Sequence, residues 1–268
     1  MTGAAAAAAL AAWSAWFEPR RLVVRRLPLA LPAWPRQLDG LRVGIVSDLH
    51  TGVPHAGLDA TSRAVTAVGA EAPDLICLLG DFIDRSSRIT RRVDTDALAA
   101  RLAPLRAQRG VVAVLGNHDW YSGGRRIADA VEAVGIPVLE DDAREAGAGL
   151  WVAGVSDYRV RGSDLERALR AVPAGEAAIL LSHDPDVFPL VPPRVALTLS
   201  GHTHGGQVAI PLLRTRFVPS RYGERFVRGQ VVERGRHLFV SSGVGTSGLP
   251  VRLGRPPEVV ILTLRAAS

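Results

Sequence analysis

The sequence predicts an α/β fold in which two mixed β-sheets pack together and helices lie on the outside. Short, continuous runs of aliphatic and β-branched residues are typical of strands buried on both faces. Between these runs, apolar residues recur at helical spacing, and the last third of the 268-residue chain returns to strand-like runs. Strands that alternate with helices and then give way to a β-rich end favour a layered sandwich.

Ten runs are predicted as strands, at residues 41–46, 75–79, 111–115, 150–155, 178–181, 195–199, 207–210, 226–232, 237–241 and 259–264. Four segments are predicted as helices, at residues 58–70, 94–105, 127–135 and 165–169. Pro73 ends the first helix, and Asp94 or Thr95 lies near the N-cap of the second.

Residues 37–268 are predicted to form one domain. The polar motifs described below span positions 48 to 204, so they must converge within a single fold. The only cysteine, Cys77, lies in an apolar run. We therefore expect a buried structural thiol and no internal disulfide.

Residues 1–36 differ from the rest of the chain. An uncharged, alanine-rich run covers residues 3–17 and is shorter than the ~20 apolar residues that a transmembrane helix needs. Leu10, Trp13 and Phe17 would share one helical face. The basic residues that follow are Arg20, Arg21, Arg25 and Arg26. This pattern predicts an interfacial anchor on anionic headgroups and then a proline-rich connector, with a disordered or simply packed helix as the alternative.

The composition is strongly basic, with a formal net charge of +6 and a pI near 10.7, which favours an anionic partner such as phosphate or an acidic membrane. The stripe of aromatic and basic residues that single-strand binders use is missing, so no specific nucleic-acid partner is expected. All 32 basic residues are arginine, and Asn117 is the only asparagine. An amide kept at that one position indicates a neutral oxygen ligand, with a helix cap or turn as the alternative.

Five clusters of Asp, Asn or His follow predicted strands. They are Ser47-Asp48-Leu49-His50, Gly80-Asp81-Phe82-Ile83-Asp84, Gly116-Asn117-His118-Asp119, Ser182-His183-Asp184-Pro185 and Gly201-His202-Thr203-His204-Gly205-Gly206-Gln207. Loops at the carboxyl ends of such strands usually carry the sites of α/β proteins. In the last cluster, two imidazoles two residues apart point to one side of the backbone, and such a pair suits Zn, Mn or Fe.

This ordered set resembles the calcineurin-like metallophosphoesterase superfamily, from about Arg42 to Arg265. The last cluster, a glycine-rich segment at residues 242–248 and Arg255-Pro256-Pro257-Glu258-Val259 are similar to a bacterial, often membrane-associated branch. That branch includes UDP-2,3-diacylglucosamine pyrophosphohydrolases of lipid A synthesis. The resemblance implies a four-layer αββα sandwich and a hydrolase on the cytoplasmic side of a bacterial membrane, with a soluble cytoplasmic enzyme as the alternative.

The resemblance also implies two divalent metal ions, with Mn as first choice and Fe or Zn as alternatives. It assigns one ion to Asp48, His50, Asp81 and His204, and the other to Asp81, Asn117, His183 and His202. Asp81 would bridge the ions, because a carboxylate offers two anionic oxygens. Two ions about 3.5–4 Å apart clamp phosphoryl oxygens and acidify a water, which suits cleavage of a phosphodiester or pyrophosphate.

By the same resemblance, His118 stays off the metal and hydrogen-bonds the phosphoryl group or protonates the leaving oxygen, with Asp119 holding its ring. A purely structural His118 is the alternative. Asp84 is predicted to be a turn or strand-end residue, and His55 and His237 to be structural or surface histidines.

Substrate contacts are predicted for basic and aromatic residues after the last cluster and near the C-terminal glycine loop, with a solvated loop as the alternative. The candidates are Arg214, Arg216, Arg221, Tyr222 and Arg252. The preferred substrate is a lipid-linked nucleotide, UDP-2,3-diacylglucosamine. The alternatives are a phosphodiesterase for nucleotides or nucleic acid and a catalytically silent, metal-bound scaffold.

Overall fold

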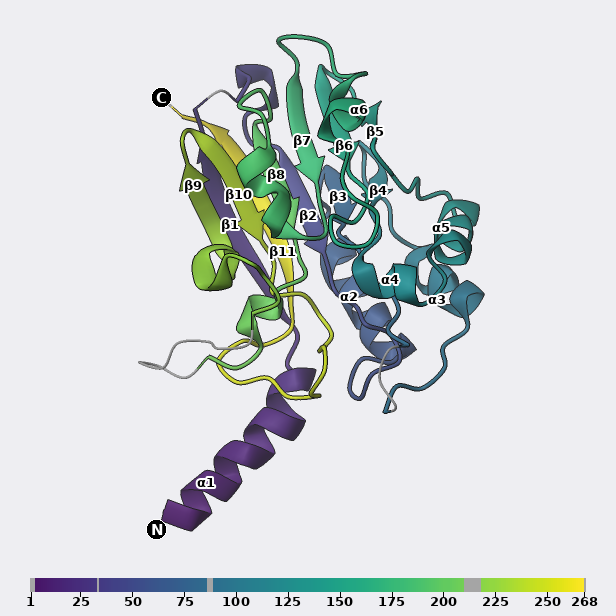
Figure 1. The fold of residues 1–268 in the computed structure, drawn as a ribbon, viewed down its shortest axis with the longest axis vertical. Coiled ribbons are helices and arrows are strands. Elements are labelled where there is room, and N and C mark those ends of the chain that lie inside the picture. Colours follow the sequence, from purple (N-terminus) through teal and green to yellow (C-terminus); the bar gives the residue numbers. More distant parts are fainter. Residues whose placement is uncertain (1–2, 33, 86–88, 210–217, 268) are drawn as a thin grey trace.

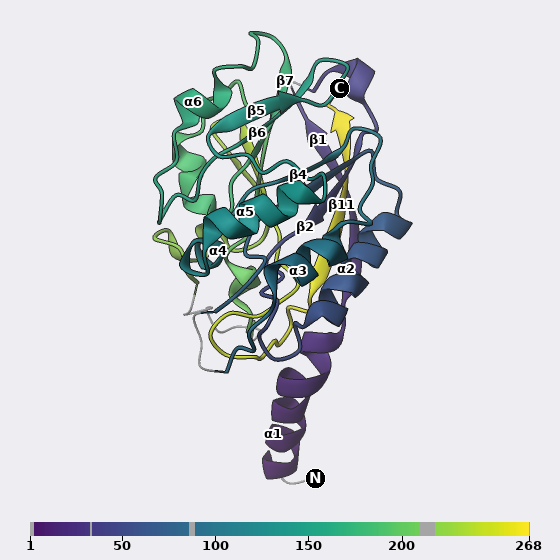
Figure 2. The ribbon, with the colours of Figure 1, turned by 90° about the vertical axis from the view of Figure 1, so that its right-hand side faces the viewer.

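The computed structural model describes residues 3–32, 34–85, 89–209 and 218–267, and it contains two mixed sheets stacked at the centre of the molecule (Figures 1 and 2). The first sheet has the order β1 (Val23–Leu31), β11 (Glu258–Ala266), β2 (Arg42–Val46), β3 (Leu75–Leu78) and β4 (Val111–Ala113). The second has the order β5 (Asp142–Glu145), β6 (Leu150–Gly154), β7 (Ala177–Leu181), β8 (Leu197–Ser200), β10 (Arg236–Val240) and β9 (Gly229–Glu233).

Strands β2, β3 and β4 run parallel to one another, as do β6, β7, β8 and β10. Because parallel strands end at the same edge of a sheet, the loops after β2, β3 and β4 gather at one edge, and those after β7 and β8 gather at the matching edge of the second sheet. This topology brings distant polar clusters together.

Three hydrophobic layers separate the four structural layers. Alternate residues of β3 point to opposite faces, so Leu75 and Cys77 lie in the core between the sheets, whereas Ile76 and Leu78 face the helices. The helices over the first sheet are α2 (Leu58–Ala70), α3 (Thr95–Leu102), α4 (Asn117–Tyr121) and α5 (Gly124–Ala133). The second sheet is covered by α6 (Leu165–Leu169) and a 3-10 helix at Pro185–Leu190. The predicted αββα sandwich and the buried Cys77 are confirmed.

The predicted helices and most predicted strands are confirmed, within a few residues at their ends. Asp94 caps α3, since its side chain accepts hydrogen bonds from the backbone N–H groups of Asp96 and Ala97. The strand predicted at 207–210 is wrong over its described residues, because Val208 makes only an isolated bridge to Leu253. Residue 210 lies outside the described residues.

The predicted proline-rich connector is wrong for residues 23–31, which form β1. This strand pairs with β11 along its whole length, and Pro28 is tolerated because β1 is an edge strand. Two arginines that had been assigned to headgroup binding belong to β1 instead. Arg25 forms an ion pair with the buried Glu258, and Arg26 forms one with Glu71.

The N-terminal helix α1 (Gly3–Ala12) projects from the sandwich and buries none of its residues (Figure 1). It continues as a π-helix, Trp13–Phe17, which contacts two loops of the body. The Ser14 carbonyl accepts a hydrogen bond from the Arg252 N–H at 2.9 Å, and the Trp16 ring lies 5.9 Å from the His55 ring. Within the described ranges, we find no helix with the length and apolar character needed to cross a membrane.

Candidate metal centre

The polar clusters at the strand ends meet at one buried site. Asp48 and His50 follow β2, Asp81 follows β3, Asn117 opens α4 after β4, His183 follows β7, and His202 and His204 follow β8. All seven side chains are buried. Among the described residues, possible ligand atoms lie within 4.8 Å of one another in three groups. These are Asp48 with His50 and His204, His50 with Asp81 and His118, and Asp81 with His183 and His202.

The first group brings two imidazoles nitrogen to nitrogen. His50 Nε2 lies 3.0 Å from His204 Nε2, and the carboxylate of Asp48 lies 3.9 and 3.6 Å from these two atoms. Asp48 is itself held by the backbone N–H of His202, which donates to both carboxylate oxygens.

The group of Asp81, His183 and His202 repeats this arrangement. His183 Nε2 lies 3.1 Å from His202 Nδ1 and 3.1 Å from Asp81 Oδ2. The same Asp81 oxygen lies 3.3 Å from His50 Nε2, so it reaches both groups. Its other oxygen accepts a hydrogen bond from the His118 backbone N–H at 2.9 Å.

These residues fit a pair of divalent cations. Two imidazole nitrogens bound to one metal at about 2.1 Å would lie about 3.0–3.4 Å apart, which matches both imidazole pairs. Asn117 Oδ1 is buried and has no hydrogen-bond partner among the described residues, an arrangement that is costly unless another group occupies the space. The alternative of a helix cap is wrong, because Gly116 is the N-cap residue of α4.

The backbone at the site is strained. Five of the seven residues have positive φ angles, between 43° and 70°. They are Asp48, His50, Asp81, His202 and His204. Non-glycine residues in such conformations cost about 1–3 kcal/mol each and persist where the surrounding structure holds them. Space is also tight, since a Cβ on Gly116 would lie 2.2 Å from Asp81 Oδ1.

Two of the imidazoles have raised pKa values. Burial alone would lower the pKa of His50, but hydrogen bonds to Asp81 and Asp84 and the charge of Asp48 raise it to about 10. Burial also opposes protonation of His183, yet the charge of Asp81 and a hydrogen bond to it hold the pKa of His183 well above its usual value. Without metal, both rings are therefore cationic at neutral pH and balance the carboxylates.

The other two imidazoles have lowered pKa values. Burial and the charge of His183 lower the pKa of His202 to about 3. Burial and the charge of His50 hold the pKa of His204 well below its usual value. These rings are neutral at neutral pH, which is the form that binds metals.

Backbone carbonyls fix the orientation of two rings from outside the site. His183 Nδ1 donates to the Leu79 carbonyl at 2.7 Å, which directs Nε2 toward Asp81. His202 Nε2 donates to the Pro219 carbonyl at 2.8 Å, which directs Nδ1 toward His183. Contacts of this kind select the tautomer of a metal-binding histidine.

The predicted contact between Asp119 and the His118 ring is wrong. Asp119 accepts hydrogen bonds from the backbone N–H groups of Phe82, Ile83 and Gly116, so it ties the ends of β3 and β4 together. Burial raises its pKa to about 7.

Asp84 occupies the place that had been predicted for Asp119. It is fully buried, with one oxygen 3.2 Å from His118 Nδ1 and the other 3.4 Å from His50 Nδ1. The sequence predicted a turn or strand-end residue rather than a ligand, and the structure adds that this carboxylate faces the rings of His50 and His118. The signal in the sequence is a second Asp three residues after Asp81, within one strand-end cluster.

Among the predicted substrate residues, those that the structure describes have the following places. Arg214 and Arg216 lie outside the described residues. Arg221 is exposed and lies over the Tyr158 ring at 4.9 Å, whereas Tyr222 packs 5.2 Å from Phe226 in the core of the second sheet.

The predicted substrate contact of Arg252 is wrong. Its side chain is fully buried, and the guanidinium donates to the carbonyls of Ser242, Gly243, Gly245 and Arg255. Burial lowers its pKa to about 10. His55 and His237 belong to none of the groups of possible ligands in the described part of the chain, as predicted.

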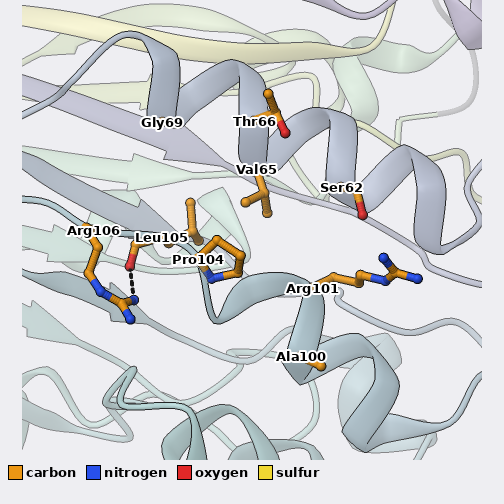
Figure 3. A pocket seen from close by; sticks show the side chains of 9 residues that line it. All are labelled: Ser62, Val65, Thr66, Gly69, Ala100, Arg101, Pro104, Leu105 and Arg106. Carbon is orange, nitrogen blue, oxygen red and sulfur yellow. Dashed lines mark hydrogen bonds between the residues drawn. The ribbon is translucent and has the colours of Figure 1, made fainter.

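A cavity of about 460 Å³ lies between α2 and α3, and none of the proposed metal ligands lines it (Figure 3). Val65, Pro104 and Leu105 supply apolar surface, and Arg101 and Arg106 flank it. Its lining contains neither imidazole nor carboxylate, so it offers no metal ligand.

Comparisons with known proteins agree with this site. The sequence matches the profile described as calcineurin-like phosphoesterase over residues 41–206, which contain all seven proposed metal ligands. An uncharacterized metallophosphoesterase of Aquifex aeolicus (strain VF5) is 35% identical over 235 residues, which cover 84% of this chain and 85% of the relative. The uncharacterized metallophosphoesterase YkuE of Bacillus subtilis (strain 168) is 28% identical over 279 residues, covering 100% and 96%. A Danio rerio protein named "Transmembrane protein with metallophosphoesterase domain" is 28% identical over 267 residues, covering 93% of this chain and 58% of the relative.

Proposed function

The chain belongs to the calcineurin-like phosphoesterase family, and from this premise we propose that it hydrolyses a phosphodiester or pyrophosphate bond in a lipid-linked substrate at an anionic membrane surface. That it is a metal-dependent phosphoesterase follows from the family and from the grouped ligands. The membrane location and the lipid-linked substrate are the new elements. One observation carries them: the π-helix that continues the exposed N-terminal helix contacts the loop after β2, which carries Asp48 and His50, and the C-terminal loop at Arg252.

The link between helix and site runs through two contacts. Trp16 packs on His55, five residues after His50. Ser14 bonds the backbone of Arg252, whose guanidinium bonds the Gly245 carbonyl, and the Gly245 N–H bonds the Asp48 carbonyl at 2.6 Å. A membrane that binds the helix therefore lies close to the reaction.

The helix has the side chains of an interfacial anchor. Leu10, Trp13, Trp16 and Phe17 are between 44% and 59% exposed. Arg20 follows them, with its guanidinium 3.6 Å from the centre of the Trp16 ring. Aromatic rings beside arginine suit the boundary between headgroups and acyl chains, and cytoplasmic leaflets carry the anionic lipids that arginine prefers. The Danio rerio relative is named as a transmembrane protein, which supports a membrane location.

In the proposed mechanism, Asp48, His50, Asp81 and His204 would hold one ion, and Asp81, Asn117, His183 and His202 would hold the other. When bound, the two ions neutralise the phosphoryl oxygens and lower the pKa of a water molecule so that it attacks at neutral pH. The ligands are nitrogen and oxygen without thiolate, a set that suits Mn, Fe and Zn. We propose Mn because of the family resemblance, with Fe and Zn as the alternatives to test.

His118 supplies the proton for the leaving oxygen. Asp84 faces its Nδ1, so the ring presents Nε2 to the substrate. A histidine positioned to donate a proton to the leaving oxygen during bond cleavage contributes about 100- to 10,000-fold to the rate. Among the predicted substrate residues that the structure describes, the exposed Arg221 beside Tyr158 is our candidate for a second contact to phosphate.

The specific substrate we propose is UDP-2,3-diacylglucosamine, from which hydrolysis releases UMP and the lipid monophosphate. An anionic, amphiphilic molecule of this type has a phosphoryl group for the metal centre and acyl chains that place it in the membrane that the anchor binds. A second candidate is a soluble nucleotide diester. It is favoured by Tyr121, which is 63% exposed and lies 6.0 Å from the His118 ring, where it could stack a nucleobase.

The test compares the full chain with deletions of residues 1–12 and 1–17, all loaded with Mn²⁺. Substrates are the lipid nucleotide in anionic vesicles, the same lipid in zwitterionic vesicles, and a soluble bis-aryl phosphate. We expect the full chain to act on the lipid nucleotide, more slowly in zwitterionic vesicles. Deletion of residues 1–12 should lower only the lipid activity, because the described part of this segment, α1, projects from the sandwich and buries none of its residues. Hydrolysis of soluble diesters alone would refute the lipid-linked substrate and favour the second candidate.

A further inference from the structure

Arg159 contacts the loops that carry two of the proposed metal ligands. It lies in the turn after β6, and its Nε donates to the carboxylate of Asp184 at 2.7 Å. The other end of the guanidinium donates to the Pro219 carbonyl. Asp184 directly follows His183, and the Pro219 carbonyl is the group that accepts the proton of His202 Nε2.

The Pro219 carbonyl can orient His202 only if its own position is fixed. Pro219 has no backbone N–H and belongs to no helix or strand. Its segment is held by the buried Asp186, which accepts hydrogen bonds from the Ser220 hydroxyl and the Arg221 backbone N–H, and by Arg159. Of these contacts, only that of Arg159 is made to the carbonyl itself.

We infer that Arg159 is a positioning residue for the ion held by Asp81, Asn117, His183 and His202. Its planar guanidinium joins the Asp184 carboxylate to the Pro219 carbonyl, and so holds the His183 loop and the tautomer of His202 in one arrangement. This inference rests on the two-ion site of the proposed function. It adds a residue that none of the five sequence clusters contains.

The chemistry requires arginine in particular. Asp184 is fully buried and Asp186 nearly so, and the guanidinium lies 2.7 and 3.7 Å from their carboxylates. Its fork of donors can bond a carboxylate and a carbonyl at the same time, whereas a lysine ammonium is a compact point charge on a flexible stem. Lysine would therefore compensate the buried charge without fixing the carbonyl.

The test measures Mn²⁺ binding to metal-free protein by titration, with wild type, Arg159→Ala, Arg159→Lys and Arg221→Ala. Arg221 is the matched control, because it also lies 3.7 Å from Asp186 but makes no side-chain bond to the Pro219 carbonyl. Outer contacts to metal-binding histidines are typically worth 10- to 100-fold in affinity. We expect Arg159→Ala to bind one equivalent normally and the second about 10- to 100-fold more weakly, while Arg221→Ala binds both normally.

Two further results separate positioning from a purely structural role. Arg159→Lys should recover thermal stability without recovering the second Mn²⁺ affinity, and it remains informative if Arg159→Ala does not fold. At saturating Mn²⁺, turnover by the lysine variant should return with an unchanged KM.

Normal affinity in both Arg159 variants, or normal affinity in Arg159→Lys alone, would overturn the inference. A raised KM at saturating Mn²⁺ would do the same, since it indicates contact with substrate. Wild type that binds fewer than two equivalents contradicts the proposed function instead.

Discussion

Binding of Mn²⁺ to the metal-free protein is predicted to release about two protons at pH 7.5. His50 and His183 carry protons in the metal-free site because the carboxylates around them raise their pKa values, and a metal binds only the neutral rings. His202 and His204 are already neutral and release none. The four imidazoles are therefore expected to release two protons, not four, and any proton held by Asp48, whose pKa burial raises, adds to this count.

The size of the effect follows from the pKa of His50, which is about 10. At pH 7.5, removing its proton costs ~3 kcal/mol, since each pH unit below the pKa corresponds to about 1.4 kcal/mol. This lowers the apparent affinity of that ion by two to three orders of magnitude relative to pH 10. The Mn²⁺ affinity therefore rises with pH up to about pH 10, by about tenfold per pH unit for each proton released.

The assay is isothermal titration calorimetry of Mn²⁺ binding in two buffers with different ionisation enthalpies, repeated at several pH values. Asp84→Asn is the control, because the carboxylate facing His50 Nδ1 contributes to the raised pKa of that ring. The variant should release fewer protons. Heats that do not depend on the buffer, or an affinity that falls as the pH rises, would refute this account of the electrostatics.

Three more substitutions test individual parts of the site. His118→Ala should lower kcat about 100- to 10,000-fold for substrates with poor leaving groups while keeping two bound ions, and full turnover would exclude it as the acid. Gly116→Ala should lose at least one ion in metal analysis, because its Cβ would lie 2.2 Å from Asp81 Oδ1, and a fully loaded variant would contradict this geometry. Asp119→Asn replaces one of the two carboxylate oxygens that accept from backbone amides with an NH₂ donor and should destabilise the fold by about 1–3 kcal/mol, which an unchanged melting temperature would disprove.

The strand-end clusters were predictable because parallel strands place their carboxyl ends at a common edge. Once the runs before Asp48, Asp81 and Asn117 were identified as buried strands, their convergence followed from topology. The clusters at His183 and His202 followed for the same reason in the second sheet. Each motif is local in sequence, so a short run of residues contains the whole signal.

The residues that were missed act across loops. Asp84 has the spacing of a turn residue, and only burial between His50 and His118 reveals its role. Arg252 looks like a surface arginine, but the glycine-rich loop folds around its guanidinium. Arg159 meets Pro219 across 60 residues, and no local pattern encodes such a contact.

The N-terminal region was misread for a related reason. Arg25 and Arg26 suggested headgroup binding, and Pro28 suggested the start of a proline-rich connector. As an edge strand, β1 can expose those arginines and accommodate Pro28 while its pairing with β11 completes the sheet. Strand pairing over more than 200 residues of separation leaves no mark in the local composition.

Anomalous diffraction from crystals of Mn²⁺-loaded protein tests the central claim most directly. The account predicts two peaks about 3.5–4 Å apart, with the Asp81 carboxylate between them and Asn117 Oδ1 beside the peak near His183. A single peak, or two peaks with Asp81 touching only one of them, would contradict the paired-ion site on which the proposed reaction depends.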